Sequence, residues 1–288
     1  MSALYKRELK SYFRGLTGCL FCAVYLIWSG IFMLIYNLKS AIAQPEATMY
    51  YNLLLLLLII PILTMRTFAE ERRQKTDQLL LSLPLTTGKI VMAKYLSAMT
   101  VIALPIVFTG VYPLILSLFG TVNLASAYAA LFAELLFAAL IAAIGVFISA
   151  LCENPAIAAI LSIVVNAALF FLTQLVGSDL STSEWTSLIA VAVLIVLAAL
   201  LVYFLTKSFG AAYVFGAVGV IAAVVIFLIK RELYAGAVNA WINAISPIDR
   251  MTPFMSGIFD LTAVVYYVAG SALFLFFSLQ AVEKRRWN

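Results

Sequence analysis

The sequence predicts an all-α protein, a polytopic membrane bundle of about eight transmembrane helices, and three observations lead to this fold class. The 288 residues are 65% hydrophobic, with a mean hydropathy of +1.10, whereas soluble domains use about 45–50% apolar residues. The apolar residues gather in long stretches, and the charged residues, only 11% of the total, lie mostly between them. A chain of this length cannot bury so much apolar surface in its own core, so lipid must cover part of it.

Eight apolar stretches are long enough to cross a bilayer, for which a helix needs about 20 residues. They are residues 16–38, 49–67, 90–118, 127–151, 155–175, 187–206, 212–229 and 261–281. Only a short segment separates the sixth from the seventh, and a hairpin that dips into the membrane is an alternative for this pair. Because no intervening stretch is long enough for a soluble domain, we predict a single transmembrane domain over residues 1–288.

Residues 1–15 predict a separate helix that lies along the membrane surface. Its apolar and basic side chains form two faces, which consist of Leu4, Leu9, Tyr12 and Phe13 against Lys6, Arg7, Lys10 and Arg14. Such a helix places its cations beside anionic lipid headgroups. The alternative is a positively charged flank that only orients the first transmembrane helix.

The basic residues of the short loops indicate the orientation of the chain. With a cytoplasmic N-terminus, most of the 18 lysines and arginines lie on the cytoplasmic side, as the positive-inside rule requires. An even number of crossings then places the basic C-terminal residues 283–288 on the same side. We therefore expect a multi-pass protein of the cell membrane with both termini in the cytoplasm.

Residues 68–89 predict a short cytoplasmic helix between the second and third crossings. The segment begins with charges of both signs and continues with a leucine-rich run that ends at Pro84. Glu71 and Lys75 have the i,i+4 spacing of a favourable helical ion pair, and Pro84 disfavours helical geometry at the residue before it. A basic loop that only sets the topology is the alternative, but such a loop would not need acids. Both signs of charge beside leucines favour a docking surface for a cytosolic protein.

Four polar side chains inside the apolar stretches are candidates for a substrate path: Glu134, Asn52, Asn166 and Gln174. An acid inside a membrane is a functional candidate because its burial is costly. The alternative for Glu134 is a carboxyl that is hydrogen-bonded to a neighbouring helix, and both readings stay open. For the three amides, pairing between helices is favoured over ligand contact.

The composition excludes several kinds of site. The chain has no histidine, which excludes Ser-His-Asp catalysis and every histidine metal site. Its three cysteines, Cys19, Cys22 and Cys152, do not cluster with other soft metal ligands. We expect no catalytic residue, no metal and, because the cations flank membrane stretches, no nucleic-acid partner. The outer loop at residues 230–260 is either a lid over an exit or an aromatic anchor at the interface.

Three stretches carry a resemblance to a known family. After the second crossing, the matching residues are Phe68, Glu70, Glu71, Arg72, Thr76, Leu79, Leu80, Leu83, Pro84 and Lys94. Near the C-terminus, they are Ser246, Pro247, Phe254, Gly257, Asp260, Leu261, Tyr266 and the ending Glu283–Trp287. With the N-terminal segment Leu4–Phe13, they resemble the permease subunits of ABC type-2 transporters, in particular the gliding-motility-type branch. The similar stretches cover about a third of the chain.

This resemblance implies an ATP-driven transporter whose permease forms a dimer with two cytosolic ATPase subunits. The family's coupling helix corresponds to the segment at 68–89, which implies a set of ATPase-coupling residues: Phe68, Glu70, Glu71, Arg72, Arg73, Thr76, Leu79, Leu80, Leu83 and Pro84. Such permeases commonly have six transmembrane helices, so residues 187–229 would form an extra hairpin. The resemblance implies neither a particular substrate nor a role in gliding motility.

We therefore expect a permease subunit that exports an amphiphilic or peptide-like substrate. Gly88-Lys89 lacks the earlier glycine of a P-loop, so this chain should bind no cofactor itself, and ATP and Mg²⁺ are expected only in the partner ATPase. The other expected partners are a second permease copy or a related permease, an accessory membrane subunit and the lipid bilayer. The alternative function is a non-transporting membrane scaffold or sensor of an ABC-type complex.

Overall fold

The computed structural model describes residues 1–40, 42–77, 86–176, 188, 195, 199, 209–229 and 246–286. Every regular element among these residues is a helix. The chain divides into two compact units, one made of Met1–Ala167 with Arg250–Asn288 and the other of Ala168–Asp249. The first unit contains most of the described residues.

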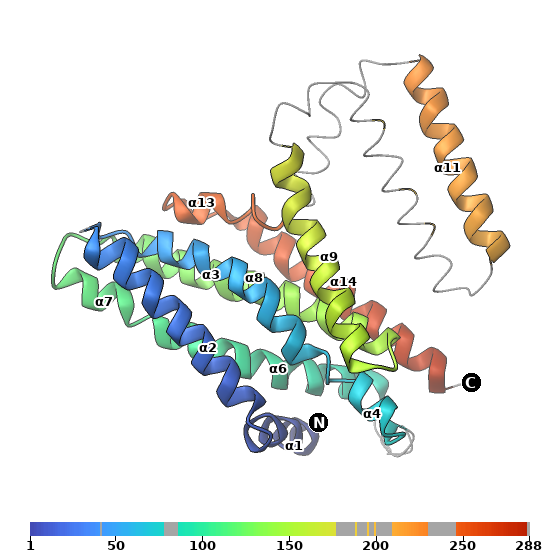
Figure 1. The fold of residues 1–288 in the computed structure, drawn as a ribbon, viewed down its shortest axis with the longest axis horizontal. Coiled ribbons are helices and arrows are strands. Elements are labelled where there is room, and N and C mark those ends of the chain that lie inside the picture. The colour runs from blue at the N-terminus through green and yellow to red at the C-terminus, as the bar shows by residue number, and fades with distance from the viewer. Residues whose placement is uncertain are drawn as a thin grey trace. The chain divides into compact units, whose positions relative to one another are not determined.

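The first unit is a bundle of long apolar helices with several short ones (Figure 1). In chain order, its helices are α1 (Ser2–Arg14), α2 (Thr17–Phe32), the π-helix η1 (Met33–Lys39), α3 (Pro45–Thr64), α4 (Ala69–Arg73), α6 (Thr87–Thr109), α7 (Tyr112–Ser117), α8 (Leu124–Leu151), α13 (Thr252–Met255) and α14 (Leu261–Arg286). A further helix, α9 (Pro155–Val176), begins in this unit and continues into the second.

Helix α8 lies at the centre of the first unit and packs against α3, α6 and α14. Every residue from Leu140 to Ala150 is buried. Small side chains allow the helices to approach closely, and a Cβ added at Gly145 would overlap the side chain of Thr64 on α3. Lipid tails are as apolar as leucine, so close packing of this kind holds membrane helices together.

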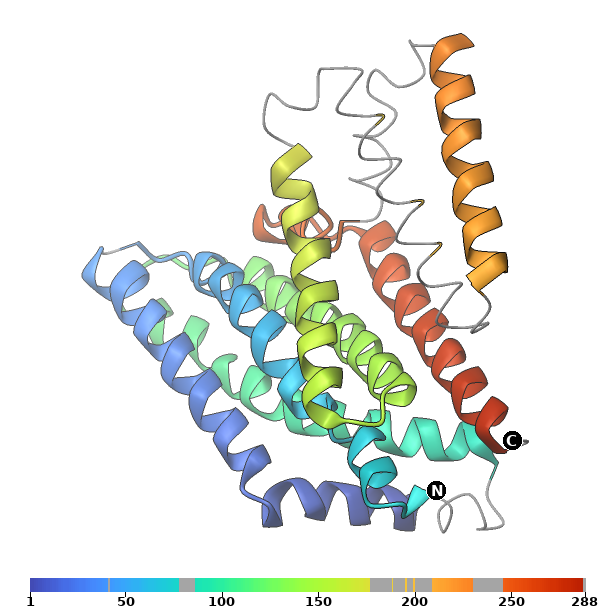
Figure 2. The same cartoon turned by 45° about the vertical axis from the view of Figure 1, so that its right-hand side comes forward.

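Helix α1 is separate from the apolar helix that follows it. The chain turns at Leu16, whose φ of 60° lies in the left-handed region. Figure 2 shows α1 lying across the foot of the bundle at a steep angle to α2. It packs against α6 and α2, and its Leu4 and Tyr12 are buried. A helix therefore forms within residues 1–15, while its position at a membrane surface stays a prediction.

Among the described residues, five helical segments are long and apolar enough to cross a membrane: Thr17–Lys39, Pro45–Arg73, Thr87–Ser117, Leu124–Leu151 and Leu261–Arg285. They correspond to the first four predicted stretches and the last one. The predicted stretch at 155–175 forms the 22-residue helix α9. The stretch at 187–206 lies outside the described residues except at 188, 195 and 199. The total of eight crossings therefore stays a prediction.

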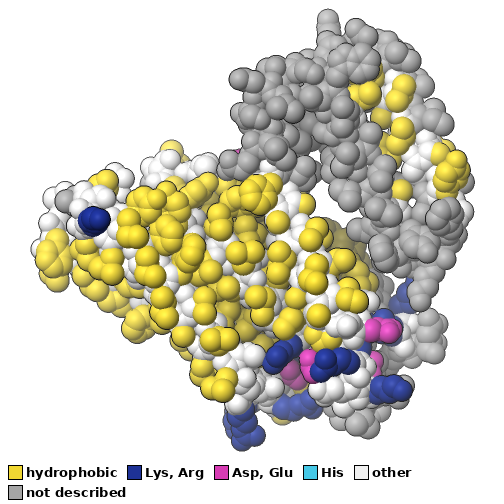
Figure 3. Space-filling model, in the orientation of Figure 1, with side chains coloured by type: hydrophobic (Ala, Val, Ile, Leu, Met, Phe, Trp, Pro, Cys, Tyr) yellow, Lys and Arg dark blue, Asp and Glu magenta, His cyan; other side chains and the backbone are white. Residues whose placement is uncertain are grey.

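The first unit presents a broad apolar surface. Figure 3 shows hydrophobic side chains over this face, with most of the charged side chains gathered at one end. Leu20 and Ile27 on α2 and Phe108 on α6 are all more than half exposed. Surface this apolar is covered by acyl chains or by other membrane helices. The chain is therefore a multi-pass membrane protein.

The two ends of the first unit differ in how many charged side chains they carry. The basic end is formed by α1, α4, the start of α6 and the end of α14, where the charged side chains gather. The far end is formed by the segments at the other ends of the long helices, namely the loop between η1 and α3, the loop between α7 and α8, and α13.

The second unit contains the apolar helix α11 (Phe209–Ile229). A Cβ added at Gly216 would lie 3.1 Å from Ala199 Cβ, and one added at Gly219 would meet Ile195. The two glycines thus face residues of the preceding stretch. The extra hairpin at 187–229 stays a prediction, because most of its first arm lies outside the described residues.

Candidate functional site

The basic end holds an ion cluster around the buried side chain of Lys94, near the start of α6. Lys94 is 1% exposed. Its ammonium nitrogen lies 2.8 Å from Glu71 Oε1 and 3.5 Å from Glu8 Oε2, and 5.3 Å from the centre of the Phe68 ring. A buried charge must be paired, because it has lost its hydration. The Lys94 cluster, made of Lys94, Glu71, Glu8 and Arg7, therefore ties α6 to α1 and α4.

Arg7 supplies the second cation of the Lys94 cluster. It lies 3.8 Å from Glu71 Oε1 and 3.9 Å from Glu8 Oε1. Two carboxylates thus face two cations, which leaves the cluster without net charge. Burial, together with the negative charge of Glu8, raises the pKa of the neighbouring Tyr12 above its ordinary value. Tyr12 therefore stays neutral and packs as a largely apolar side chain.

Hydrogen bonds hold α4 against the end of α8. The backbone N–H groups of Phe68 and Ala69 donate to Ser149 Oγ, each at 3.1 Å. Ser149 thus satisfies donors of the first helical turn, which have no partner within the helix. Arg72 of α4 also bonds the end of α8, because its Nη1 donates to the carbonyl oxygen of Cys152 at 3.1 Å. The position of α4 is therefore fixed by α8 as well as by the Lys94 cluster.

The opposite side of α4 is a polar surface exposed to solvent. Arg73, 62% exposed, lies 3.2 Å from Glu70 Oε1, and Gln74 Nε2 donates to the same oxygen at 2.9 Å. Lys75 follows with a φ of 56°. The predicted ion pair between Glu71 and Lys75 is wrong, because the Glu71 carboxylate binds Lys94 inside the protein. The exposed side chains of α4 remain available to a partner.

The C-terminal helix α14 also joins the basic end. Thr87, the first residue of α6, donates a hydrogen bond to Glu283 Oε1 at 2.8 Å. Arg285 lies 3.5 Å from Glu153 Oε1, in the turn that follows α8. Helix α14 is thus connected to the start of α6 and to the turn after α8 at the basic end.

The predicted coupling residues divide into two groups. Six of them lie at the basic end: Phe68, Glu70, Glu71, Arg72, Arg73 and Thr76. Leu79, Leu80, Leu83 and Pro84 lie outside the described residues. The sequence interpretation missed the roles of Glu8 and Ser149. Lys94 offered one signal, because a lone cation at the start of an apolar stretch needs a counter-ion.

Within the bundle, the structure brings Glu134 and Asn52 together with Tyr25 and Ser29. The Tyr25 hydroxyl donates to Glu134 Oε1 at 2.6 Å. Asn52 Nδ2 lies 3.1 Å from the Tyr25 hydroxyl and 3.2 Å from Ser29 Oγ. All four side chains are fully buried, and among the described residues Glu134 Oε2 and Asn52 Oδ1 have no hydrogen-bond partner. This Glu134 cluster connects α2, α3 and α8.

The other two predicted intramembrane residues do not join the Glu134 cluster. Asn166 on α9 is buried, and neither atom of its amide has a hydrogen-bond partner in the part of the chain that the structure describes. Gln174 also lies on α9, but its side chain is outside the described set. Sequence reasoning missed Tyr25 and Ser29, because uncharged residues in an apolar helix give no signal of a polar site.

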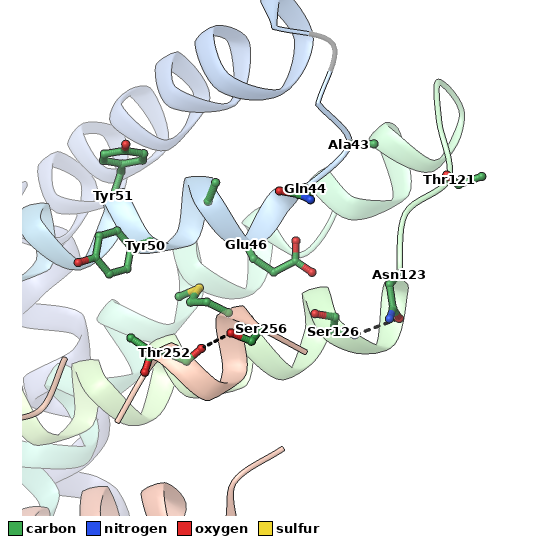
Figure 4. Close-up of a pocket in the computed structure, with 12 residues that line it drawn as sticks. Ala43, Gln44, Glu46, Tyr50, Tyr51, Thr121, Asn123, Ser126, Thr252 and Ser256 are labelled. Carbon is green, nitrogen blue, oxygen red and sulfur yellow. Dashed lines mark hydrogen bonds between the residues drawn. The ribbon is translucent and has the colours of Figure 1, made fainter. Parts of the chain in front are cut away.

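A cavity of about 800 Å³ opens at the far end (Figure 4). It is lined by Ala43, Gln44, Glu46, Ala47, Tyr50, Tyr51, Thr121, Asn123, Ser126, Thr252, Met255 and Ser256. Small-molecule sites commonly have volumes of about 300–1,000 Å³. Part of its wall is α13, which forms within the predicted outer loop at 230–260; that loop is described only from residue 246 onward. The lining comes from distant segments without a common motif, so the sequence did not indicate this cavity.

One comparison with known proteins identifies a family. The family model described as ABC-2 family transporter protein matches residues 17–213, which is more than half of the chain. The match includes α4, Lys94 and the whole Glu134 cluster, whereas α1, α13 and α14 lie outside it. No curated protein and no solved structure matches the chain.

Proposed function

The chain belongs to the ABC-2 family of transporter proteins, and from this premise we propose that it is the permease subunit of an exporter that a separate ATPase drives. Family membership and the long apolar helices make it a membrane permease component. We place the basic end in the cytoplasm, in line with the positive-inside rule. A cytosolic ABC ATPase then docks on the exposed side of α4, and that subunit holds ATP and Mg²⁺.

The observation that carries this proposal is the Lys94 cluster. A force applied to the exposed side of α4 passes through Glu71 to Lys94 and so to α6. The same force reaches α8 through the hydrogen bonds of Ser149 and Arg72. A short helix that is fixed on several sides moves with the helices that hold it. Such a helix suits a coupling element better than a loop that only sets topology.

The free energies are of the right size for this role. A switch between two states from 1:99 to 99:1 requires a differential binding free energy of about 5.5 kcal/mol. Breaking a buried ion pair by removing one partner costs about 3–5 kcal/mol. Separating the ion pairs around Lys94 would therefore cost a free energy close to the one that nucleotide binding supplies for the switch. They favour movement of α4 and α6 together over local separation.

The remaining features of the proposal rest on the family and on the sequence. We propose a dimer with a second permease copy, or with a related permease, and an accessory membrane subunit as a further partner. The resemblance of the residues near the C-terminus favours the gliding-motility-type branch, and we propose that the chain belongs to it. The apolar surface and the scarcity of charges inside the helices favour an amphiphilic or peptide-like substrate, because an ion path would need more charged groups.

Charge reversal at Arg73 tests the docking of the ATPase on α4. Arg73→Glu changes an exposed side chain whose ion-pair partner among the described residues is the neighbouring Glu70, so the permease should still fold and insert. Like charges brought together at an interface should weaken ATPase binding about tenfold or more. Co-purification of the ATPase and export from proteoliposomes measure the effect.

Lys39→Glu is the matched control, because Lys39 is an exposed cation at the other end of the bundle. It should leave ATPase binding unchanged. Normal binding and export with Arg73→Glu would contradict the proposal. An assembled complex that hydrolyses ATP, but is stimulated by no transported compound, would support the scaffold or sensor instead.

A further inference from the structure

The cavity at the far end is a preformed hollow. Asn37 Nδ2 donates to two carbonyl oxygens of the loop before α3, at 3.0 and 2.9 Å. The Thr48 hydroxyl donates to Asn37 Oδ1 at 2.5 Å. These bonds fix the loop that forms one wall. On another side, Gly257 has a φ of 77°, and a Cβ added there would lie 3.1 Å from Ser126 Oγ. Small-molecule sites are usually preformed in this way.

The lining of the cavity has a negative charge and no positive one. Glu46 is the charged residue among the lining side chains, which otherwise offer hydroxyl, amide, thioether and aromatic groups. Figure 4 shows the Glu46 carboxylate extending from α3 into the space beside Ser126 and Ser256. Within the part of the chain that the structure describes, Glu46 forms no ion pair. The cavity therefore favours a cation.

Two tyrosines connect the cavity with a column of aromatic rings. Tyr50 and Tyr51 line the cavity. The Tyr51 ring stacks on Tyr36 and Phe32, with centroids 4.5 and 4.9 Å apart, and Phe32 in turn contacts Trp28 at 4.8 Å. Aromatic faces attract cations, and they also provide apolar surface for a chain. Tyr36 belongs to the π-helix η1, and π-helical turns are frequent at functional sites.

We propose that the cavity binds the cationic head of an amphiphile, with its ammonium group beside Glu46 and its apolar tail along the column of Tyr51, Tyr36, Phe32 and Trp28. This inference names the substrate class of the proposed exporter and so rests on that function. An anionic head would be repelled by Glu46, and a neutral head would leave the carboxylate without a counter-ion. The cavity lies at the far end, where the exporter would release its cargo.

Binding of radiolabelled dodecyltrimethylammonium tests the proposal. The full chain is placed in phosphatidylcholine nanodiscs, the probe is kept below its micellar concentration, and partition into empty nanodiscs is subtracted. The wild type should show saturable binding. Glu46→Gln should weaken that binding about tenfold, because it removes the one charge that faces the head. Tyr51→Leu should weaken it less, because it removes one aromatic face.

Glu153→Gln is the matched control, because Glu153 is an exposed acid at the basic end; this variant should bind like the wild type. Unlabelled dodecyl sulfate should not compete on the wild-type chain. Equal competition by dodecyl sulfate, or unchanged binding by a Glu46→Gln variant that unfolds at the normal temperature, would overturn the proposal. The assay contains no ATPase, so its failure leaves ATPase docking untouched. Conversely, a chain that binds the probe but no ATPase would refute the proposed function alone.

Discussion

The two ends of the first unit use their acidic side chains in opposite ways. At the basic end, Glu71 is enclosed between two cations, 2.8 Å from Lys94 and 3.8 Å from Arg7. At the far end, Glu46 lines a cavity of about 800 Å³ whose lining contains no lysine or arginine. The first carboxylate is paired with cations of the protein through its Oε1 oxygen, while the second faces space that a ligand can fill.

The comparison suggests a division of labour along the bundle. Paired charges that cross-link several helices make the basic end stiff, which a force-transmitting element requires. At the far end, hydrogen bonds fix the walls of a cavity, and such a preformed cavity is typical of a small-molecule binding site. The long helices connect the two.

Removing the central cation should destabilise the basic end most. Lys94→Met leaves the partly buried carboxylates of Glu71 and Glu8 with Arg7 as their remaining cation, so the free energy of unfolding should fall by about 3–5 kcal/mol. Unfolding in detergent, followed by circular dichroism, measures this loss.

A double variant controls for the loss of the lysine side chain itself. Adding Glu71→Leu to Lys94→Met replaces the closest ion pair by apolar side chains, and such replacements are often tolerated. The double variant should therefore be more stable than Lys94→Met alone. If Lys94→Met alone unfolds like the wild type, the Lys94 cluster does not hold the basic end together.

The Glu134 cluster lies between the two ends and should show an intermediate effect. Glu134→Ala leaves the buried Tyr25 hydroxyl without its acceptor and creates a void, so it should cost about 2–3 kcal/mol. Glu134→Gln keeps both the volume and an acceptor oxygen, so it should cost less than about 1 kcal/mol. The same unfolding measurement compares the two. Equal losses would show that the Tyr25 hydrogen bond contributes little.

Removing the hydroxyl of Ser149 should loosen α4 without disturbing the far end. Ser149→Ala leaves the N–H groups of Phe68 and Ala69 without an acceptor, which costs about 1–2 kcal/mol locally. Hydrogen exchange should therefore accelerate at the amides of α4, while the amides of α3 near Glu46 keep their rate. Unchanged exchange at α4 would mean that Ser149 does not fix this helix.

The smallest effect concerns the thiol of Cys152, whose reactivity depends on how α4 packs against the end of α8. Burial raises the pKa of Cys152, although Arg72 and Arg285 partly oppose this rise. The thiolate is the reactive form, so alkylation at neutral pH should be slow and should accelerate as the pH rises toward the raised pKa. Ser149→Ala should speed the reaction by exposing the thiol. Alkylation of the folded chain as fast as that of the chain unfolded in dodecyl sulfate would contradict this expectation.

Much of the fold could be predicted, because apolar length is a local property of the sequence. The stretches at 16–38 and 261–281 became transmembrane-length helices for this reason. The packing of side chains against one another was harder to predict from the sequence. Glu71 and Lys75 have favourable spacing, but Glu71 instead binds Lys94. Leaving a buried cation without a counter-ion costs more free energy than an exposed helical ion pair gains.

The candidate sites were predictable only where a residue stood out by its chemistry. Glu134 and Lys94 are charges in or beside apolar stretches, so each indicated a need for a partner. Ser149 is one serine in an alanine-rich helix, and only its position opposite the first turn of α4 gives it a role. The cavity around Glu46 arises from loops that meet in three dimensions, so no local pattern marks it.

Cross-linking tests most directly the central claim that the ATPase acts on the exposed side of α4. With the three native cysteines replaced by serine, Arg73→Cys should form a cross-link to the ATPase subunit in the purified complex when a short bifunctional thiol–amine reagent is added. Lys39→Cys, at the opposite end, should form none. A cross-link from position 39, or none from position 73 in an assembled and active complex, would contradict the claim.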